Sequence, residues 1–417
     1  MGTDGDDRGA EDHREDLRVT AVAVGGEGVA REVSGRVVFV AGALPGERVV
    51  ADVVEEHPRH ARAVAVDVLE ASPDRVAPPC PFVAAGCGGC GWQHVDLRAQ
   101  RELKAAMVAD ALGRLGGVAD PRVAAGPPLA GAGYRTTIRA VADAQGRLAL
   151  RRHHSHDLVA VPGCLVAHPL VAEVLAAGRF PLGADVTVRA GARTGERMVV
   201  VDGLHDEGGG RDTGVDDIVV PEGVRVVTGA ELAAGKRAWL HEEVAGVRLR
   251  VSARSFFQAG PEAAEALAAT VATDAGEVAE GARLVDLYGG VGLFAATVGR
   301  GANVELVEAS ASSVADARVN LRSRDARVVR SDVARWRARP ADVLVADPPR
   351  AGLGRGGVRA VRATRAPRLV LVSCDAGALG RDAGLLAGAG YRLVASTVVD
   401  AFPHTPHVEV VSRFDRR

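Results

Sequence analysis

The cysteines are the residues with the clearest potential for chemistry. Cys80, Cys87 and Cys90 form a C-x6-C-x2-C pattern in a Pro- and Gly-rich segment, Cys164 follows in VPGC, and Cys374 ends the apolar run RLVLVSC. The N-terminus carries no secretory signal, so we expect a cytoplasmic protein, whose thiols stay reduced. We therefore interpret the five cysteines as metal ligands, nucleophiles or buried small residues rather than disulfides.

A glycine-rich loop is the second chemical feature. The apolar run RLVDLY leads into Gly289, Gly290 and Gly292, which predicts a strand, a turn open to a ligand, and a helix. Glu308 closes the next apolar run about 20 residues later, where a carboxylate can bind ribose hydroxyls. The loop matches neither the full dinucleotide pattern nor a P-loop, so S-adenosylmethionine is the favoured cofactor. Asp332 is placed either to meet its adenine or to cap a helix.

Two further apolar runs end in polar residues. One leads into Asp347-Pro-Pro-Arg350 and the other into Cys374. Ligands of an open α/β sheet bind beyond the carboxyl ends of its strands, so both segments should face the crevice of the glycine loop. The prolines stiffen a loop whose carboxylate and guanidinium suit a planar heterocycle. A structural turn and an inert buried thiol are the alternatives.

Cys374 and Glu409 together suggest a reaction. C5 of uracil is a poor nucleophile, and addition of a thiolate at C6 turns the ring into an enolate able to attack a sulfonium methyl group. A base must then remove the C5 proton. Glu409 lies in the apolar run HVEVV, where partial burial would raise its pKa. The alternative is an exposed glutamate on a strand.

The surrounding elements predict an α/β protein of several parts. Residues 1–16 have the composition of a disordered acidic tail, and residues 17–72 show short β-rich runs typical of a small barrel. Residues 73–250 form a mixed α+β central region with a helix from Asp96 to about Leu115. In residues 251–417, strands alternate with helices, which predicts a Rossmann-like parallel sheet covered on both faces.

The composition of the chain limits which binding partners are possible. The chain has 417 residues, 47% of them hydrophobic, and no run long enough to span a membrane. A formal net charge of -2 means that any RNA site must be a local basic surface. The basic residues are arginines except for Lys104 and Lys236, and arginine suits phosphate and base contacts, although codon bias also explains it. We expect a monomer.

Taken in order, the segments SFFQ, DLYGGVG, DPPRAGL, SCDAGALGRD and FPHTPHVE resemble the RNA uracil-5-methyltransferase family, whose members act on ribosomal or transfer RNA. The N-terminal barrel is similar to that family's TRAM domain. The resemblance implies that Cys374 is the nucleophile and Glu409 the proton acceptor. It places Gln258, Tyr288, Glu308 and Asp332 at the methyl donor, and Asp347 at the target uracil or the cofactor. We expect Gly290 of the glycine loop to lie at the methyl donor as well, and Arg350 and Phe257 to lie beside the flipped-out uracil of a structured RNA, with ribosomal RNA favoured over transfer RNA.

The resemblance also bears on the remaining cysteines. One branch of the family carries an iron-sulfur cluster on C-x5-C-x2-C and a distant cysteine, so the resemblance implies a [4Fe-4S] cluster on Cys80, Cys87, Cys90 and Cys164. A structural zinc ion fits the same count of ligands and is the alternative.

The chain departs from the family pattern at four places: Gly289 replaces a frequent Cys, Leu293 an Asn, Gly260 an Asn, and Asp375-Ala376 the Asn-Pro after the nucleophile. These departures leave two rival functions. One is a non-catalytic RNA-binding protein on the same fold. The other is a methyltransferase acting on a different RNA base, but such enzymes usually place an aromatic residue where Arg350 stands and need no cysteine.

Overall fold

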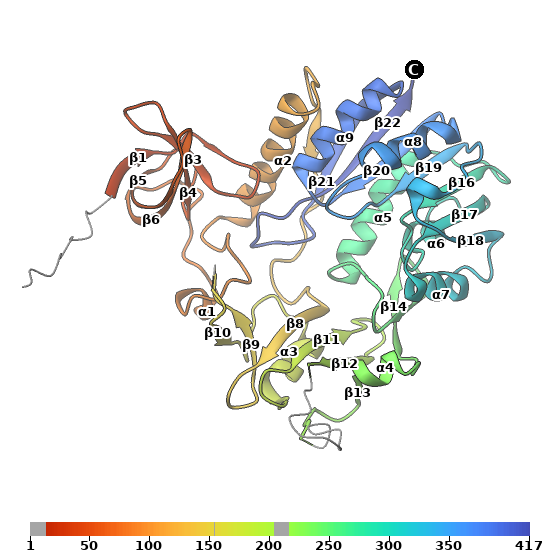
Figure 1. Ribbon diagram of the computed structural model, residues 1–417, viewed down its shortest axis with the longest axis horizontal. Helices are drawn as coiled ribbons and strands as arrows, with labels where there is room; N and C mark the ends of the chain where they lie inside the picture. The colour runs from red at the N-terminus through yellow and green to blue at the C-terminus, as the bar shows by residue number, and fades with distance from the viewer. Residues whose placement is uncertain (1–13, 154, 204–216) are drawn as a thin grey trace, which may run out of the picture. The chain divides into compact units, whose positions relative to one another are not determined.

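The computed structural model describes residues 14–153, 155–203 and 217–417 (Figure 1). The chain divides into two compact units. The first comprises the N-terminal residues through Ala77 together with His94–Asp96, and the second comprises Pro78–Gln93 and Leu97–Arg417. Among the described residues, no helix combines the length and apolar character needed to cross a membrane.

The first unit is a coiled β-sheet. Its described strands are ordered β1-β5-β6-β4-β3-β2, and all neighbours are antiparallel except β4 and β6. Register shifts along β5 and β6 bend the sheet, so that β1 also approaches β3 and the apolar faces enclose a small core. The strands are β1 (Arg14–Arg18), β2 (Ala21–Val22), β3 (Gly28–Arg31), β4 (Val37–Ala41), β5 (Arg48–Glu56) and β6 (His60–Glu70).

The first strand begins earlier than the sequence suggested. Residues 14–16 were expected in the acidic tail, but they belong to β1 and pair with β5. Arg48 donates to the Asp16 carboxylate at 2.5 Å across this pair. Pairing with β5 makes these residues part of a strand, which their composition alone did not indicate. The rest of the expected tail, residues 1–13, lies outside the described residues.

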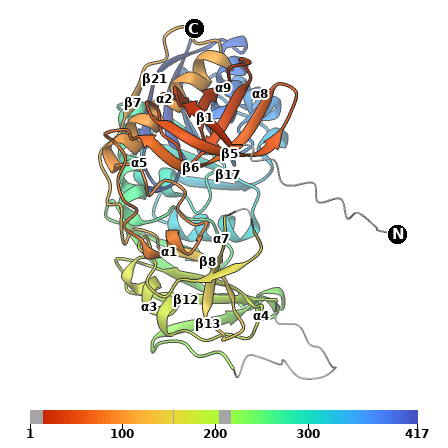
Figure 2. The same cartoon turned by 90° about the vertical axis from the view of Figure 1, so that its left-hand side faces the viewer.

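The central region opens with two helices and is built around a second sheet, drawn in yellow and green in Figures 1 and 2. The described strands of that sheet are ordered β10-β9-β8-β11-β12-β13, with α3 packed on one face. The expected helix in residues 96–115 is confirmed as α2. The elements are α1 (Pro81–Ala84), α2 (Leu97–Arg114), β7 (Val123–Ala125), β8 (Thr137–Ala142), β9 (Leu148–Arg151), β10 (Leu158–Ala160), α3 (Pro169–Ala177), β11 (Asp185–Ala190), β12 (Arg197–Asp202), β13 (Val224–Thr228), α4 (Gly229–Ala233), and the hairpin β14 (Trp239–Val244) and β15 (Val247–Ser252).

The C-terminal region has the expected Rossmann-like sheet, whose described strands are ordered β18-β17-β16-β19-β20-β22-β21-β7. Helices α5, α6 and α7 share one core with alternate strand residues, while α2, α8 and α9 pack side by side on the other face. The elements are α5 (Pro261–Ala275), β16 (Arg283–Leu287), α6 (Leu293–Thr297), β17 (Asn303–Glu308), α7 (Ala311–Asn320), β18 (Ala326–Arg330), the 3-10 helix η1 (Val333–Arg335), β19 (Val343–Ala346), α8 (Gly354–Thr364), β20 (Arg368–Ser373), α9 (Ala376–Gly388), β21 (Tyr391–Val399) and β22 (Glu409–Arg416).

One expectation for this sheet was wrong. It is not purely parallel, because β22 runs antiparallel to both β20 and β21. The connection from β21 to β22 contains no crossover helix, and a direct connection returns the chain beside the strand it has just left. β7, from the central region, adds a further parallel strand beside β21.

Candidate active site

The sheet register places Cys374 opposite Glu409. Ser373 is the last residue of β20 and pairs with Val410 in β22, so the next position on β20 faces the residue before Val410. Burial raises the pKa of Cys374 to about 11, and the negative charges of Glu409 and Asp347 add to this, whereas Arg350 lowers it. The four side chains therefore form one electrostatic group at the carboxyl ends of β19 and β20.

Glu409 is the more deeply enclosed acid of this group. It is 5% exposed, and its burial, followed by the charge of Asp347, raises its pKa well above the usual value. Burial also raises the pKa of the partly exposed Asp347, to about 7. Arg350 is exposed, and its positive charge opposes the rise in the pKa of Glu409. Such acids can hold or release a proton near neutral pH.

The glycine loop is shaped by Glu308. The Gly290 N–H donates to one carboxylate oxygen of Glu308 at 3.0 Å, and the Ser310 N–H donates to the other at 2.6 Å. Tyr288, Gly290 and Gly292 all have positive φ, at 57°, 54° and 93°. Non-glycine residues with this conformation are uncommon and cluster at ligand sites. The loop thus presents its backbone at the end of β16, beside the group around Cys374.

Tyr288 and Asp332 interact electrostatically beside this loop. Burial raises the pKa of Tyr288 to about 12, and the charge of Asp332 is the next contribution. Asp332 also caps η1, since one of its oxygens accepts from the Ala334 N–H at 2.7 Å. Of the two roles the sequence left open, the structure therefore shows the cap, and it leaves the second carboxylate oxygen with no partner within the described chain.

Sequence reasoning missed Asp286. This residue is fully buried in β16, and one of its oxygens accepts from the Ala295 N–H at 3.0 Å, while the other has no hydrogen-bond partner among the described residues. Burial raises its pKa to about 8; the Ala295 bond lowers it, and Asp347 and Glu308 raise it. Asp286 is therefore coupled electrostatically to Glu308 of the glycine loop and to Asp347 of the Cys374 group. An acidic residue inside the apolar run RLVDLY was the available signal.

Two departures from the family pattern occur where the backbone is closely packed. A Cβ atom at Gly289 would lie 2.6 Å from Leu306 Cγ, and one at Gly260 would lie 2.3 Å from the Tyr134 carbonyl oxygen. Neither position has room for a side chain in this backbone arrangement. A third departure keeps its function, because Asp375 caps α9 by accepting from the Ala378 N–H at 2.7 Å.

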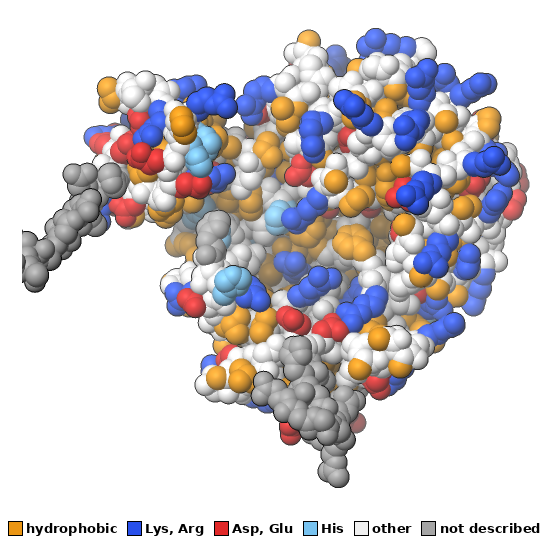
Figure 3. Space-filling model, in the orientation of Figure 1, with side chains coloured by type: hydrophobic (Ala, Val, Ile, Leu, Met, Phe, Trp, Pro, Cys, Tyr) orange, Lys and Arg blue, Asp and Glu red, His pale blue; other side chains and the backbone are white. Residues whose placement is uncertain are grey.

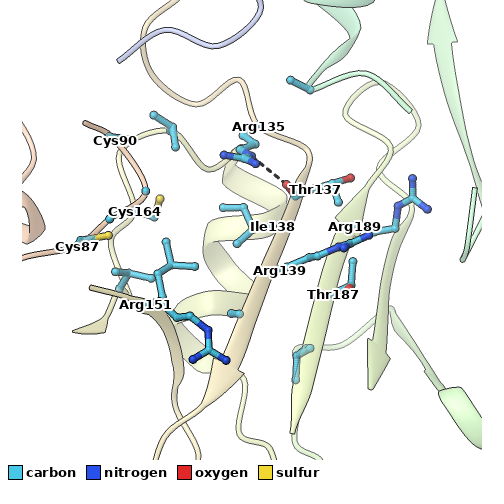
Figure 4. A pocket seen from close by; sticks show the side chains of 18 of the residues that line it. Cys87, Cys90, Arg135, Thr137, Ile138, Arg139, Arg151, Cys164, Thr187 and Arg189 are labelled. Atoms are coloured by element: carbon cyan, nitrogen blue, oxygen red, sulfur yellow. Dashed lines mark hydrogen bonds between the residues drawn. The ribbon is translucent and has the colours of Figure 1, made fainter. Parts of the chain in front are cut away.

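A large cavity adjoins these groups. Its volume is about 1100 Å³, and Phe257, Gln258 and Arg350 line it together with the open face of β8, β9 and β11. Figure 4 shows arginines from these strands pointing along the wall, and Figure 3 shows Lys and Arg side chains gathered around a hollow in the surface. Gln258 is buried, and its Oε1 atom has no hydrogen-bond partner among the described residues. Other lining residues are Arg135, Arg139, Arg151, Arg254, Phe256 and Phe402.

The other four cysteines line the same cavity. Figure 4 shows Cys87, Cys90 and Cys164 together at one end of it. All are free thiols, and burial raises the pKa of Cys87, Cys90 and Cys164, with smaller contributions from neighbouring thiols. Within the described ranges, no three His, Cys, Asp or Glu side chains are arranged closely enough to hold a metal ion. The chemistry of the donor set fits a thiolate-bound metal, but its sulfurs are not drawn together into a ligand shell.

Comparison with known proteins agrees with this architecture. Residues 14–66 match the TRAM domain model. An uncharacterized RNA methyltransferase of Streptomyces coelicolor is 38% identical over 427 residues, which cover 95% of this chain and 92% of that protein. The 23S rRNA (uracil(1939)-C(5))-methyltransferase RlmD of Halomonas elongata is 32% identical and is aligned over 96% of this chain and 89% of its own length.

A solved structure shows the same fold. The Pyrococcus abyssi tRNA (uracil-54, C5)-methyltransferase, in complex with S-adenosyl-L-homocysteine, superposes with a TM-score of 0.73 at 23% identity, covering 96% of this chain and 100% of that one. The fold likeness and the full-length similarity in sequence lead to one conclusion: this chain belongs to the RNA uracil-5-methyltransferase family.

Proposed function

We propose that the protein methylates C5 of a uridine in RNA with S-adenosylmethionine, through a covalent bond between Cys374 and C6 of the base. The opposition of Cys374 and Glu409 across β20 and β22 carries this proposal, because the reaction needs a nucleophile and a base on one pyrimidine ring. The relatives named for uracil-C5 methylation of RNA support it.

The residues around the glycine loop fit the methyl donor. The buried Oε1 atom of Gln258 has no hydrogen-bond partner in the described part of the chain, which is costly unless a ligand donates to it. Tyr288, Gly290, Glu308 and Asp332 lie in or next to the half-buried loop at the ends of β16 and β17. When bound, S-adenosylmethionine supplies an electrophilic methyl group on a sulfonium sulfur.

Cys374 and Glu409 then divide the covalent chemistry. The Cys374 thiolate would add to C6, and the ring electrons would move toward C5, which would bond to the donor's methyl carbon as the bond from that carbon to the sulfonium sulfur breaks and its electron pair stays on the sulfur. Glu409 takes the C5 proton, the electron pair of that C–H bond restores the C5–C6 double bond, and the C6–S bond breaks to return the thiolate. Arg350 favours the thiolate by lowering the pKa of Cys374. Asp347 and Phe257 would position the ring.

The cavity is suited to an RNA substrate. Arginines along its wall can contact phosphates, and Phe256, which is 67% exposed, offers a flat apolar surface to an unstacked base. We infer that a flipped uridine enters from this side and that ribosomal RNA is the substrate, with transfer RNA as the alternative. The protein would act in the cytoplasm as a monomer.

The cysteine end of the cavity is a candidate metal site. We propose that Cys80, Cys87, Cys90 and Cys164 bind a [4Fe-4S] cluster with a structural or RNA-contacting role, and zinc is the alternative. The shared location and free state of the four thiols support this, although their present spacing is too open for a metal. Anoxic purification followed by iron, sulfide and zinc analysis tests it; zinc without iron would contradict the cluster.

The test of the function is transfer of label from the methyl donor to RNA. The purified protein should label unmodified 23S ribosomal RNA, and nucleoside analysis should find 5-methyluridine. Label on transfer RNA alone would show that transfer RNA, rather than ribosomal RNA, is the substrate. Label on another base would contradict the assignment to uridine. No transfer to any RNA would favour a non-catalytic RNA-binding protein.

A further inference from the structure

The loop of residues 400–408, which leads into Glu409, is held by contacts from other segments in addition to its own hydrogen bonds, such as those from Thr405 to the Phe402 oxygen. Val399 pairs with Glu409, so this loop closes the hairpin between β21 and β22 and delivers the carboxylate to the site. It contains no regular secondary structure, and His404 has a φ of 66°, which is costly for a residue with a side chain. Such a conformation persists only when surrounding contacts impose it.

Those contacts fall on three successive carbonyl groups. Lys104 Nζ donates to the Phe402 oxygen at 3.0 Å, the Tyr134 hydroxyl donates to the Pro403 oxygen at 3.0 Å, and the Trp92 N–H donates to the His404 oxygen at 2.8 Å. Each donor comes from a different part of the chain. Three fixed points on consecutive peptide groups leave the loop little freedom to shift.

The partners are also fixed to one another. Gln100 accepts from the His404 N–H at 2.7 Å and donates to the Trp92 oxygen at 3.1 Å. It therefore joins the loop to the segment that carries Cys80, Cys87 and Cys90. Lys104 forms a 2.5 Å ion pair with Asp400 at the start of the loop. Gln100 and Lys104 are fully buried on α2, where an unsatisfied polar group is expensive.

We propose that Gln100, Lys104 and Tyr134 are positioning residues. They hold the loop of residues 400–408 so that Glu409 is correctly placed to remove the C5 proton. This inference rests on the proposed function, in which Glu409 is the base. A buried network of this kind costs more to break than its individual bonds suggest, and small displacements of a catalytic group strongly reduce rates. Loosening the loop should slow proton removal and leave addition of Cys374, which lies on β20, largely unaffected.

The cleanest variant is Tyr134→Phe, which removes the hydroxyl that holds the Pro403 carbonyl and keeps the ring. Its matched control is Tyr391→Phe. Tyr391 is also buried, and its hydroxyl donates to the Ala366 carbonyl at 2.8 Å, away from the loop. The double variant Lys104→Met with Asp400→Asn removes the ion pair without leaving an unpaired buried charge.

The experiment follows two labels in a single turnover. Transcripts of 23S ribosomal RNA and of transfer RNA carry tritium at C5 of uridine, and the methyl donor carries carbon-14. Methyl incorporation reports addition and transfer, whereas tritium release reports proton removal. For Tyr134→Phe, the ratio of tritium release to methyl incorporation should fall by at least about fivefold. A covalent protein-RNA adduct should accumulate, while Tyr391→Phe keeps the wild-type ratio.

The outcomes separate the two proposals. An unchanged ratio in both Tyr134→Phe and the double variant, or an equal loss of both rates, would overturn the positioning role alone. Wild-type protein that incorporates no methyl group would overturn the proposed function, and the positioning role with it. A lowered ratio in the double variant supports positioning even if Tyr134→Phe is too unstable to assay.

Discussion

The carboxyl groups of Asp347 and Glu409 are electrostatically coupled at the end of the sheet. Burial raises the pKa of Glu409 well above its usual value, and the negative charge of Asp347 raises it further. A proton acceptor with a raised pKa is stronger once deprotonated, but it is available only at higher pH. The pair therefore sets the pH at which the proposed base can work.

Replacing Asp347 with Asn should shift this pH dependence. Removing the neighbouring charge lowers the pKa of Glu409, so the rising limb of tritium release against pH should move to lower pH. The measurement is a pH profile of single-turnover tritium release, in which the position of the limb is compared rather than its height. A limb that stays in place would show that Asp347 does not set the ionisation of the base.

Cys374→Ala should abolish methyl transfer and leave binding of the methyl donor intact. The substitution removes the sulfur that bonds to C6 and does not alter the glycine loop. Calorimetric titration with S-adenosyl-L-homocysteine measures the binding, and label transfer to RNA measures the activity. Continued turnover by this variant would refute the covalent mechanism.

Glu409→Gln should allow addition and methyl transfer but block release of the product. The amide cannot accept the C5 proton, so the C6–S bond to Cys374 persists. A slowly migrating protein-RNA species should appear on a denaturing gel, and Cys374→Ala should not form it. If no such species forms, another residue acts as the base.

Asp286→Asn should change how folding stability depends on pH. Burial raises the pKa of Asp286 from 3.8 to about 8, so the folded wild-type protein retains a proton that the unfolded chain releases. This contribution to stability is complete below pH 3.8 and is lost as pH rises toward 8. The variant avoids that loss, so its free energy of unfolding relative to wild type should rise over this range. Urea unfolding at several pH values measures this, and a constant difference would contradict it.

Asp375→Ala should destabilise the turn after the nucleophile, whereas Asp375→Asn should not. The Asp375 side chain caps α9, and loss of such a cap costs about 1 kcal/mol, while Asn caps equally well. Thermal or urea unfolding of the two variants tests this. Equal stability of the alanine and asparagine variants would show that the cap contributes nothing.

Local patterns were sufficient for much of the molecule. Apolar periodicity predicted α2 and α9, and runs of β-branched residues predicted the strands that end at Glu308 and Ser373. The order of the motifs also identified the family, and the roles proposed for Cys374 and Glu409 come from the same resemblance. Each of these inferences uses residues that lie close together in the sequence, where side-chain type directly reflects helix or strand geometry.

The sequence by itself thus determined which residues could react, and the tertiary structure decided how they meet. The antiparallel direction of β22, the Asp286 oxygen that has no partner among the described residues, and the contacts from α2 to residues 402–404 all depend on segments distant in the chain. Lys104 and Asp400 are separated by 296 positions and still form a buried ion pair. No local pattern encodes such a pairing, because strand direction and the partners of buried polar groups are chosen only when whole elements pack together.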